Sequence, residues 1–214
     1  MQAHAVANQT RSPTVAPRAG TPLVLAKDEQ LFIQGDAADS FYQVVAGAIR
    51  SYKLLSDGRR QIDAFHLGGD IFGLEAGSEH RFCAEAIGNA TVIAHRRSRL
   101  GALIEDDAAF RDRIMTATLR SLERAQDHML LLGRKTAQEK MATFLLDMAE
   151  RLSKDDEHFE LPMQRSDIAD HLGLTIETVS RTLTQMVRHG LIRLAEAGRT
   201  VILADKARLQ LLDT

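Results

Sequence analysis

The hydrophobic pattern of this chain changes near residue 98, and that change limits its fold more than any other feature. Residues 23–97 hold short apolar runs separated by turn residues, the pattern of β-strands. From Ser98 the apolar residues recur at helical spacing. Strands first and helices second predict an α+β protein. Short strands at this spacing favour an antiparallel barrel or jelly roll over a βαβ fold.

The strand region contains a clear hairpin signal. Asp57-Gly58 lies between two β-rich runs and supplies the residues that tight hairpin turns prefer. We expect a jelly-roll barrel over residues 23–107, with strands inside 41–47, 48–55, 61–67, 71–77, 84–87 and 90–95.

Residues 1–22 are polar and rich in Ala, Pro and Thr, so we expect them to be disordered. They lack the apolar stretch of a signal peptide, and no run approaches the roughly 20 apolar residues that span a bilayer. The single cysteine, Cys83, cannot form an internal disulfide, which fits a reducing compartment. We therefore expect a cytoplasmic protein without membrane contact.

The charge of the chain is balanced, with 27 Lys and Arg against 29 Asp and Glu and a formal net charge of −2. It has no overall basic excess that would hold it on nucleic acid without specificity. Any DNA-binding surface must therefore be a local positive face.

Residues 108–132 predict one long helix, because they contain neither proline nor glycine. At 1.5 Å per residue it would be about 37 Å long. A seam alternates steps of four and three, as in a coiled coil, at Met115, Leu119, Leu122, Gln126 and Met129. We interpret this seam as the contact with a second copy of the chain; packing on its own domain is the alternative. Gly133 is predicted to end the helix, which gives a dimerisation helix over 108–133.

A further helix is predicted from Thr136 to about Ser153. Its apolar stripe would belong to the core of a C-terminal domain over 134–214, and comprises Met141, Phe144, Leu145, Met148 and Leu152. Residues 154–160 are predicted to form a polar loop.

The segment 164–183 has the pattern of two short helices joined by a tight turn. Ser166 is predicted to cap the first helix and Thr175 the second. Gly173 supplies the left-handed backbone that follows a helix end, and Gly190 ends the second helix. The residues expected to face inward are Ile168, Ala169, Leu172, Val179, Leu183 and Met186. This is the geometry of a helix-turn-helix, whose second helix enters the major groove of DNA.

The second helix leaves polar residues outside, namely Glu177, Ser180, Arg181 and Thr184. Arginine donates to guanine O6 and N7, glutamate accepts from cytosine N4, and serine suits several bases. Candidate phosphate contacts, together with the backbone amides at the helix start, are Thr175, Thr178 and Thr182. Alternatively, Glu177 and Arg181 form only a surface ion pair. The runs 191–194 and 200–203, around a turn at 196–198, predict a β-hairpin wing beside this helix.

The predicted order of elements resembles the arrangement in the family that includes the catabolite activator protein and the fumarate–nitrate reduction regulator. This order is a β barrel, a dimerising helix and a winged helix-turn-helix. The resemblance covers nearly the whole chain from about residue 23. The run from Glu177 to Arg181 looks like the E-x-x-S-R recognition pattern of the fumarate–nitrate branch. Residues 65–87 and 161–183 are similar to FixK-type nitrogen-fixation regulators of rhizobia.

The resemblance implies a homodimeric transcriptional activator of microaerobic and nitrogen-fixation genes. Glu177, Ser180 and Arg181 would read a palindromic TTGAT-N4-ATCAA-like site in double-stranded DNA. Bound near a promoter, the dimer would recruit RNA polymerase. The positions of the Asp57 and Asp70 loops suggest that they touch the polymerase.

The chain departs from the ligand-sensing members of this family. Leu74 stands where cyclic-AMP-binding members carry a glutamate, and Phe82 follows Arg81 where they have a small hydroxyl residue. Nucleotide binding is therefore not expected, although Glu75 and Arg81 could substitute in a shifted register. Residues 1–30 contain no cysteine, so direct oxygen sensing through a cysteine cluster is not expected either. We expect no cofactor.

Two other classes of protein could share this strand pattern. A jelly-roll metalloenzyme would need ligands such as His66, His80, His95 and Glu75, but the sequence has no His-x-His pair and we expect no enzyme. A ligand-gated regulator of the same fold, such as a haem-bound nitric oxide sensor, would need an axial histidine, and none lies in a ligation motif. Cys83 is interpreted as a small core residue and not as a redox switch.

Overall fold

The computed structural model describes residues 20–153, 158–195 and 198–213. Most of the segment predicted to be disordered lies outside these residues. Its boundary at residue 22 is wrong, because Thr21 and Pro22 belong to the first strand and pair with Ala94 and Ile93.

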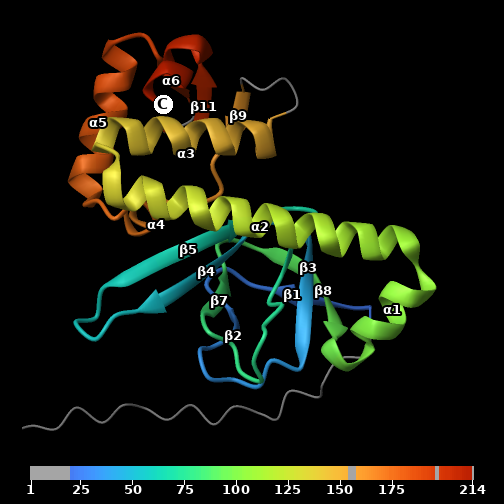
Figure 1. The fold of residues 1–214 in the computed structure, drawn as a ribbon. Helices are drawn as coiled ribbons and strands as arrows, with labels where there is room; N and C mark the ends of the chain where they lie inside the picture. Colours follow the sequence, from blue (N-terminus) through green and yellow to red (C-terminus); the bar gives the residue numbers. More distant parts are fainter. Residues whose placement is uncertain (1–19, 154–157, 196–197, 214) are drawn as a thin grey trace, which may run out of the picture.

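The N-terminal domain is a barrel of two four-stranded antiparallel sheets, ordered β1-β8-β3-β6 and β2-β7-β4-β5 (Figure 1). This confirms the jelly roll and the α+β class. The strands are β1 Thr21–Leu25, β2 Gln30–Phe32, β3 Ser40–Ala46, β4 Ile49–Leu54, β5 Arg60–His66, β6 Ile71–Phe72, β7 Cys83–Ala86 and β8 Ala90–Arg96. The predicted hairpin at Asp57-Gly58 joins β4 to β5.

The barrel core comes from the alternation of side chains along its strands. In β8, Ala90, Val92 and Ala94 are buried while Thr91 and Ile93 are partly exposed, as period-two patterning requires. Side chains from both sheets form one cluster, which includes Val44, Ile49, Phe72 and Ala84.

The helix after the barrel is longer than predicted. A 3-10 turn at Arg97–Arg99 and α1 (Leu100–Asp106) lead to α2 (Ala108–Arg134), which Asp107 caps by accepting from the Phe110 N–H at 2.9 Å. The prediction that Gly133 ends this helix is wrong. A glycine inside a helix costs only about 1 kcal/mol relative to alanine, and α2 ends where Lys135 adopts extended backbone.

The C-terminal domain contains four helices and a three-stranded sheet of order β10-β11-β9 within the described residues. Its elements are α3 Ala137–Leu152, β9 His158–Glu160, α4 Arg165–Leu172, α5 Ile176–Arg188, β10 Ile192–Ala195, β11 Thr200–Leu203 and α6 Lys206–Leu212. Thr136 and Glu139 form a capping box that starts α3, where the sequence predicted a helix start.

One predicted loop contains a strand. Residues 154–157 lie outside the described part, but His158–Glu160 forms β9 and pairs with β11. Phe159, opposite Val201, is buried beneath this sheet. The polar neighbours of Phe159 conceal the strand in the sequence, and its partner lies about forty residues further along the chain.

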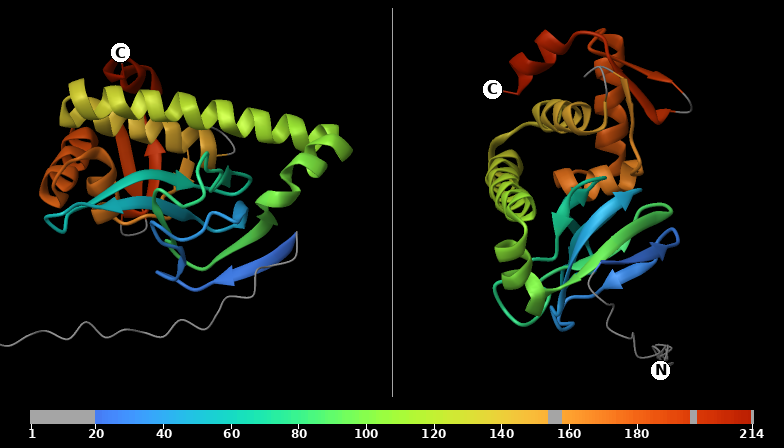
Figure 2. Two further views of the ribbon diagram at one scale, coloured as in Figure 1. Left: turned by 60° about the horizontal axis from the view of Figure 1, so that its bottom comes forward. Right: turned by 90° about the vertical axis from the view of Figure 1, so that its right-hand side faces the viewer.

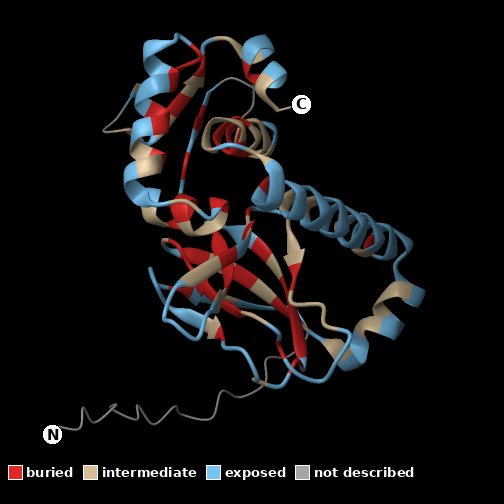
Figure 3. Cartoon of the chain, turned by 60° about the vertical axis from the view of Figure 1, so that its left-hand side comes forward, coloured by how far each residue is buried: buried red, intermediate tan, exposed pale blue. Residues whose placement is uncertain are grey.

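The two domains lie side by side, and α2 runs along both of them (Figures 1 and 2). α4 packs on β5, so the helix-turn-helix lies on the β4–β5 side of the barrel. Most of the surface of α2 is exposed (Figure 3). Among the described residues, no helix is long and apolar enough to cross a membrane.

We expect Gly47→Ala to destabilise the barrel strongly. Gly47 joins β3 to β4 with φ +77°, and an added Cβ would lie 2.4 Å from the Asn89 carbonyl oxygen. Left-handed strain costs about 1–3 kcal/mol, and the backbone clash adds to it. Urea unfolding measures the loss.

The control for this variant is Gly58→Ala. Gly58 also has positive φ, at +84°, but an added Cβ there meets only open space. Its loss of stability should be limited to the backbone strain. Equal losses for the two variants would contradict the clash at Gly47.

Candidate nucleic-acid interface

We call the helix-turn-helix formed by α4 and α5 the reading unit. Its first helix begins at a different residue from the one predicted. Gln164, not Ser166, is the N-cap of α4, and the Gln164 N–H donates to Asp167 Oδ2 at 3.1 Å. Ser166 lies inside the helix, because Asp167 occupies the position from which a side chain reaches back to the cap.

The turn between the two helices has the predicted form. Gly173 has left-handed backbone, with φ 62° and ψ 40°, and the Leu174 N–H donates back to the Ala169 carbonyl. Buried Lys140 from α3 donates to the Leu172 carbonyl at 3.1 Å, which satisfies an acceptor at the end of α4. The turn is thus fixed from inside the domain.

The second helix, α5, starts and packs as its sequence predicts. The Thr175 hydroxyl accepts from the Thr178 N–H at 3.2 Å and caps the helix. Val179, Leu183 and Met186 are buried against the domain core. This packing fixes which side of α5 faces solvent.

The exposed side of α5, which we call the reading surface, carries three residues predicted to contact DNA bases, namely Glu177, Arg181 and Thr184. Arg181 makes no hydrogen bond or ion pair with any residue that the structure describes, so the alternative surface pair with Glu177 is not formed. The Glu177 backbone N–H, followed by the Thr175 hydroxyl, lowers the pKa of the Glu177 carboxyl. An ionised acceptor and an unoccupied guanidinium therefore lie one helical turn apart.

The other polar residues of α5 differ in what they offer. Ser180 is half-buried, and its hydroxyl accepts from Arg165 Nη1 at 3.2 Å, while the Thr184 hydroxyl donates to the Ser180 carbonyl. Thr178 is half-buried with its hydroxyl 3.2 Å from that of Thr175. Thr182 is buried, with 4% of its surface exposed, so it is wrongly placed among the phosphate contacts: it lies on the packed side of the helix beside Leu183.

Arg165 is a residue of this surface that the sequence reasoning missed. It is exposed at the first position of α4 and reaches across to Ser180 on α5. The signal in the sequence that could have identified it is a basic residue at the start of the first helix of the motif.

The wing follows the predicted pattern. β10 and β11 are antiparallel, with Ile192 opposite Leu203 and Ala195 opposite Thr200. Glu196 and Ala197 of the predicted turn lie outside the described residues, and Gly198 has positive φ.

The predicted seam of α2 is an exposed apolar stripe in the single chain. Exposed fractions are 59% for Met115, 53% for Leu119, 55% for Leu122 and 67% for Met129, and Gln126 is also exposed. The seam therefore does not pack on its own domain, which was the alternative interpretation.

The two loop acids have different surroundings. Asp57 is exposed in the β4–β5 hairpin and accepts from Arg59 Nε at 2.7 Å. Asp70 accepts from the Leu67 N–H and from Arg151 Nη2 of α3, both within 2.8 Å. Its carboxylate is thus engaged within the protein.

The histidines considered as metal or haem ligands stack on aromatic rings. His66 lies on Phe72, His80 on Phe32 and His95 on Phe41, with ring centroids 4.3, 3.6 and 5.0 Å apart. No group of three His, Cys, Asp or Glu in the described part of the chain is arranged to hold a metal ion. These histidines act as aromatic packing residues, and buried Cys83 accepts from the Gln34 N–H.

Comparison with known proteins agrees with both domains. The model for the cyclic nucleotide-binding domain matches residues 22–109, and the model for the Crp-like helix-turn-helix domain matches residues 139–212. The nitrogen fixation regulation protein FixK of Azorhizobium caulinodans is 44% identical, over 95% of this chain and 84% of that protein. The transcriptional activatory protein AadR of Rhodopseudomonas palustris is 45% identical, over 81% of this chain and 74% of that protein.

A solved structure, that of FixK2 from Bradyrhizobium japonicum, superposes with a TM-score of 0.84 and 48% identity. It covers 92% of this chain and 98% of that one. Barrel, long helix and winged reading unit together define a transcription regulator with a helix-turn-helix domain. The chain belongs to the CRP/FNR family, and within it to the FixK-type nitrogen-fixation regulators.

The side chains of the barrel do not fit the cyclic nucleotide that its domain family implies. Phe32, Tyr42, Phe72 and His80 stack together inside it, with Phe32 and Tyr42 centroids 5.6 Å apart. Glu75 accepts from the Arg81 N–H at 3.1 Å, and the Arg81 residue is exposed. A nucleotide phosphate would need a buried cation beside it, whereas three members of this stack are uncharged aromatic side chains, burial lowers the pKa of His80, and Arg81 is exposed.

The side of α4 that faces the barrel carries a partly buried histidine. His171 Nδ1 donates to the Ile62 carbonyl of β5 at 3.2 Å, and His128 Nε2 of α2 donates to the His171 carbonyl at 2.8 Å. Burial lowers the pKa of the His171 imidazole to about 3. The ring is therefore neutral at pH values well above 3 in the folded protein.

Because the pKa of His171 is lowered in the folded protein, we expect the free energy of unfolding to fall in mild acid. The unfolded imidazole protonates below its ordinary pKa near 6.5 while the folded one does not, so stability is complete above that value and falls as the pH drops towards 3. His171→Gln should reduce the slope below pH 6 by up to about 1.4 kcal/mol per pH unit, the value for one proton. Urea titrations between pH 7 and 5 measure it, and an unchanged slope would exclude this origin.

Proposed function

We propose that the chain is a homodimeric activator that reads a palindromic TTGAT-N4-ATCAA-like promoter site of microaerobic and nitrogen-fixation genes. The observation that carries the proposal is the exposed guanidinium of Arg181 on α5, which has no partner among the described residues and lies one helical turn from the exposed carboxylate of Glu177. The similarity to FixK and to AadR, which is named as an activatory protein, supports the regulon and the activating role.

The chemistry of these side chains suits the proposed site. Arg181 would donate to O6 and N7 of a guanine, and Glu177 would accept from N4 of a cytosine. Each TTGAT half-site contains one G·C pair, which presents both groups in the major groove. Ser180 and Thr184, beside them on α5, would contact neighbouring bases.

Phosphate contacts would hold the helix in register. The start of α5 presents Thr175, Thr178 and the backbone amides of its first turn to an anion. We add Arg165, because its guanidinium lies beside Ser180 at the edge of the reading surface. Thr182 is not included.

The exposed stripe on α2 supports dimerisation. Two copies joined along this helix would present two recognition helices about 34 Å apart, the spacing of successive major grooves. Polymerase contact is proposed for the Asp57 hairpin alone, because Asp70 is held by Arg151. Because Arg81 is exposed and is not placed to neutralise a buried phosphate, we propose that activity does not depend on cyclic AMP. Because residues 1–30 contain no cysteine, we also propose that the chain does not sense oxygen directly through a cysteine cluster.

Arg181→Ala should relax sequence preference and weaken specific binding by ~1–3 kcal/mol, because it removes a two-bond contact to guanine. Fluorescence anisotropy with a symmetric and a scrambled duplex measures the preference. Arg188→Ala is the matched control, since it removes the same charge at the exposed C-terminal end of α5. Unchanged discrimination by Arg181→Ala would refute base reading by this residue.

Leu119→Glu combined with Leu122→Glu should give monomers that bind the palindrome poorly, because like charges would meet along the seam. Sedimentation velocity reports the mass. Ser121→Glu, an exposed change on the same helix but off the seam, should remain dimeric. A double variant that still sediments as a dimer removes the seam assignment.

A further inference from the structure

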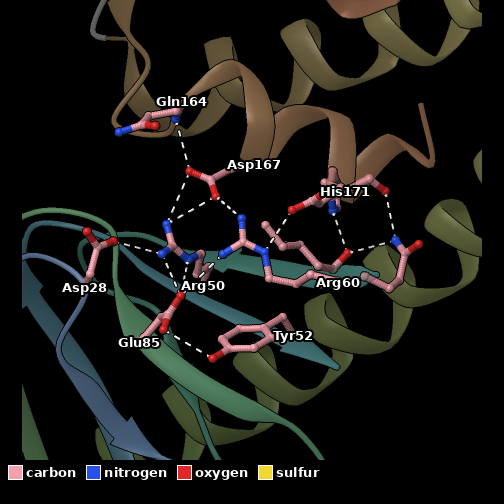
Figure 4. Close-up of polar contacts among 11 residues, drawn as sticks. Asp28, Arg50, Tyr52, Arg60, Glu85, Gln164, Asp167 and His171 are labelled. Atoms are coloured by element: carbon pink, nitrogen blue, oxygen red, sulfur yellow. Dashed lines mark hydrogen bonds and ion pairs between the residues drawn. The ribbon is translucent and has the colours of Figure 1, made fainter. Parts of the chain in front are cut away.

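A cluster of buried charges joins the barrel to the helix-turn-helix (Figure 4). We name it the interdomain charge cluster and define it as Arg50, Arg60, Glu85, Asp167 and Asp170. We infer that Arg50 and Arg60 are positioning residues for DNA recognition: they hold α4, and through it α5, at a fixed angle to the dimerisation helix. The inference rests on the proposed function.

The barrel organises its half of the cluster before the other domain is involved. Arg50 of β4 donates from Nε to Glu85 Oε1 of β7 at 2.7 Å and from Nη2 to Asp28 Oδ1 at 2.9 Å. The Tyr52 hydroxyl donates to Glu85 Oε2 at 3.2 Å. The guanidinium of Arg50 is thus held in place with its remaining nitrogen, Nη1, directed at α4.

Both arginines then reach across to α4. Arg50 Nη1 donates to Asp167 Oδ1 and Oδ2 at 3.2 and 3.3 Å, and Arg60 Nη2 donates to Asp167 Oδ1 at 2.6 Å. Arg60 Nε donates to Asp170 Oδ2 at 2.8 Å. Residues more than one hundred positions apart in sequence are paired here.

The cluster is closed to solvent at its centre. The side chains of Asp167, Arg50 and Glu85 are only 3%, 8% and 11% exposed. Removing one partner of such a buried pair leaves an uncompensated charge, so a rotation of the domains that separated them would be strongly disfavoured. Arginine–carboxylate contacts are also directional, because the planar guanidinium donates its hydrogen bonds in fixed directions.

The covalent connection between the domains restricts their angle weakly, and the cluster fixes that angle together with the Arg151–Asp70 ion pair and the His171–Ile62 hydrogen bond. The backbone is extended at Lys135 and Thr136, between α2 and α3, and this short segment separates two rigid helices. α4 is joined to α5 through the fixed turn at Gly173, so holding α4 also holds the reading surface. A dimer needs both reading surfaces at the spacing of one duplex, and a single half-site does not.

The test compares Arg60→Met with the matched control Arg59→Met. Arg59 precedes Arg60, is 77% exposed and pairs only with Asp57 of its own hairpin in the described chain. Arg59→Met therefore removes the same charge as Arg60→Met without changing a contact to α4. Three duplexes are used: the palindrome, the same half-sites moved two base pairs further apart, and a single half-site. Anisotropy gives the affinity for each, and circular dichroism confirms that each variant is folded.

We expect Arg60→Met to weaken binding to the palindrome about tenfold or more, with half-site affinity within about twofold of the parent. The preference for the palindrome over the widened site should fall with it. Arg59→Met should match the parent on all three duplexes. If Arg60→Met does not fold, Asp170→Asn is used instead, because Asp170 is at the partly exposed edge of the cluster. Asp170→Asn should lower the ratio of palindrome to half-site affinity in the same direction, by a smaller factor.

Each outcome decides between the two proposals. If the parent protein does not prefer the palindrome to a scrambled duplex, the proposed function fails, and this inference with it. If the parent prefers it and the ratio of palindrome to half-site affinity is unchanged in Arg60→Met or Asp170→Asn, only the positioning role is overturned. Tighter binding by either variant would also overturn it, because the angle seen here would then oppose DNA binding.

Discussion

The carboxylate of Asp167 connects the local structure of the reading unit with its placement on the barrel. One of its oxygens accepts from the Gln164 backbone and completes the cap of α4. The same group accepts from Arg50 and Arg60 of the barrel. A helix start and a domain contact therefore depend on a single side chain that is almost fully buried. Because α4 leads through Gly173 into α5, the orientation of the exposed reading residues follows from this contact.

Features set by neighbouring residues could be predicted from the sequence. The alternation in β8, the hairpin at Asp57-Gly58, the cap at Thr175 and the buried side of α5 each depend on residues a few positions apart. The predictions failed where a choice among neighbours was settled by tertiary contacts. Gln164 and not Ser166 caps α4, because Asp167 is held where it can complete the cap.

Other features have no local signal in the sequence. β9 exists because β11 is beside it, and its short run of residues reads as a loop. The charges of Arg50 and Asp167 are ordinary in the sequence, and only the fold brings them together. The exposed residues proposed to contact DNA were predictable because burial of Val179 and Leu183 fixes the rest of the helix. Thr182 lies three residues after Val179 and four before Met186, so helical spacing itself places it on the buried side, and its assignment to phosphate contact overlooked that spacing.

The pairing of β9 with β11 has a consequence for dissection of the molecule. These strands lie on either side of the helix-turn-helix in the sequence, so the reading unit is enclosed between two segments that need each other. A fragment cut at residue 164 would leave one edge of β11 without a hydrogen-bonding neighbour and would lose the Phe159 ring from the core. The smallest autonomous folding unit that retains the reading surface must therefore include β9, and it must also include α3, because α3 packs on α5 and α6 in the same core.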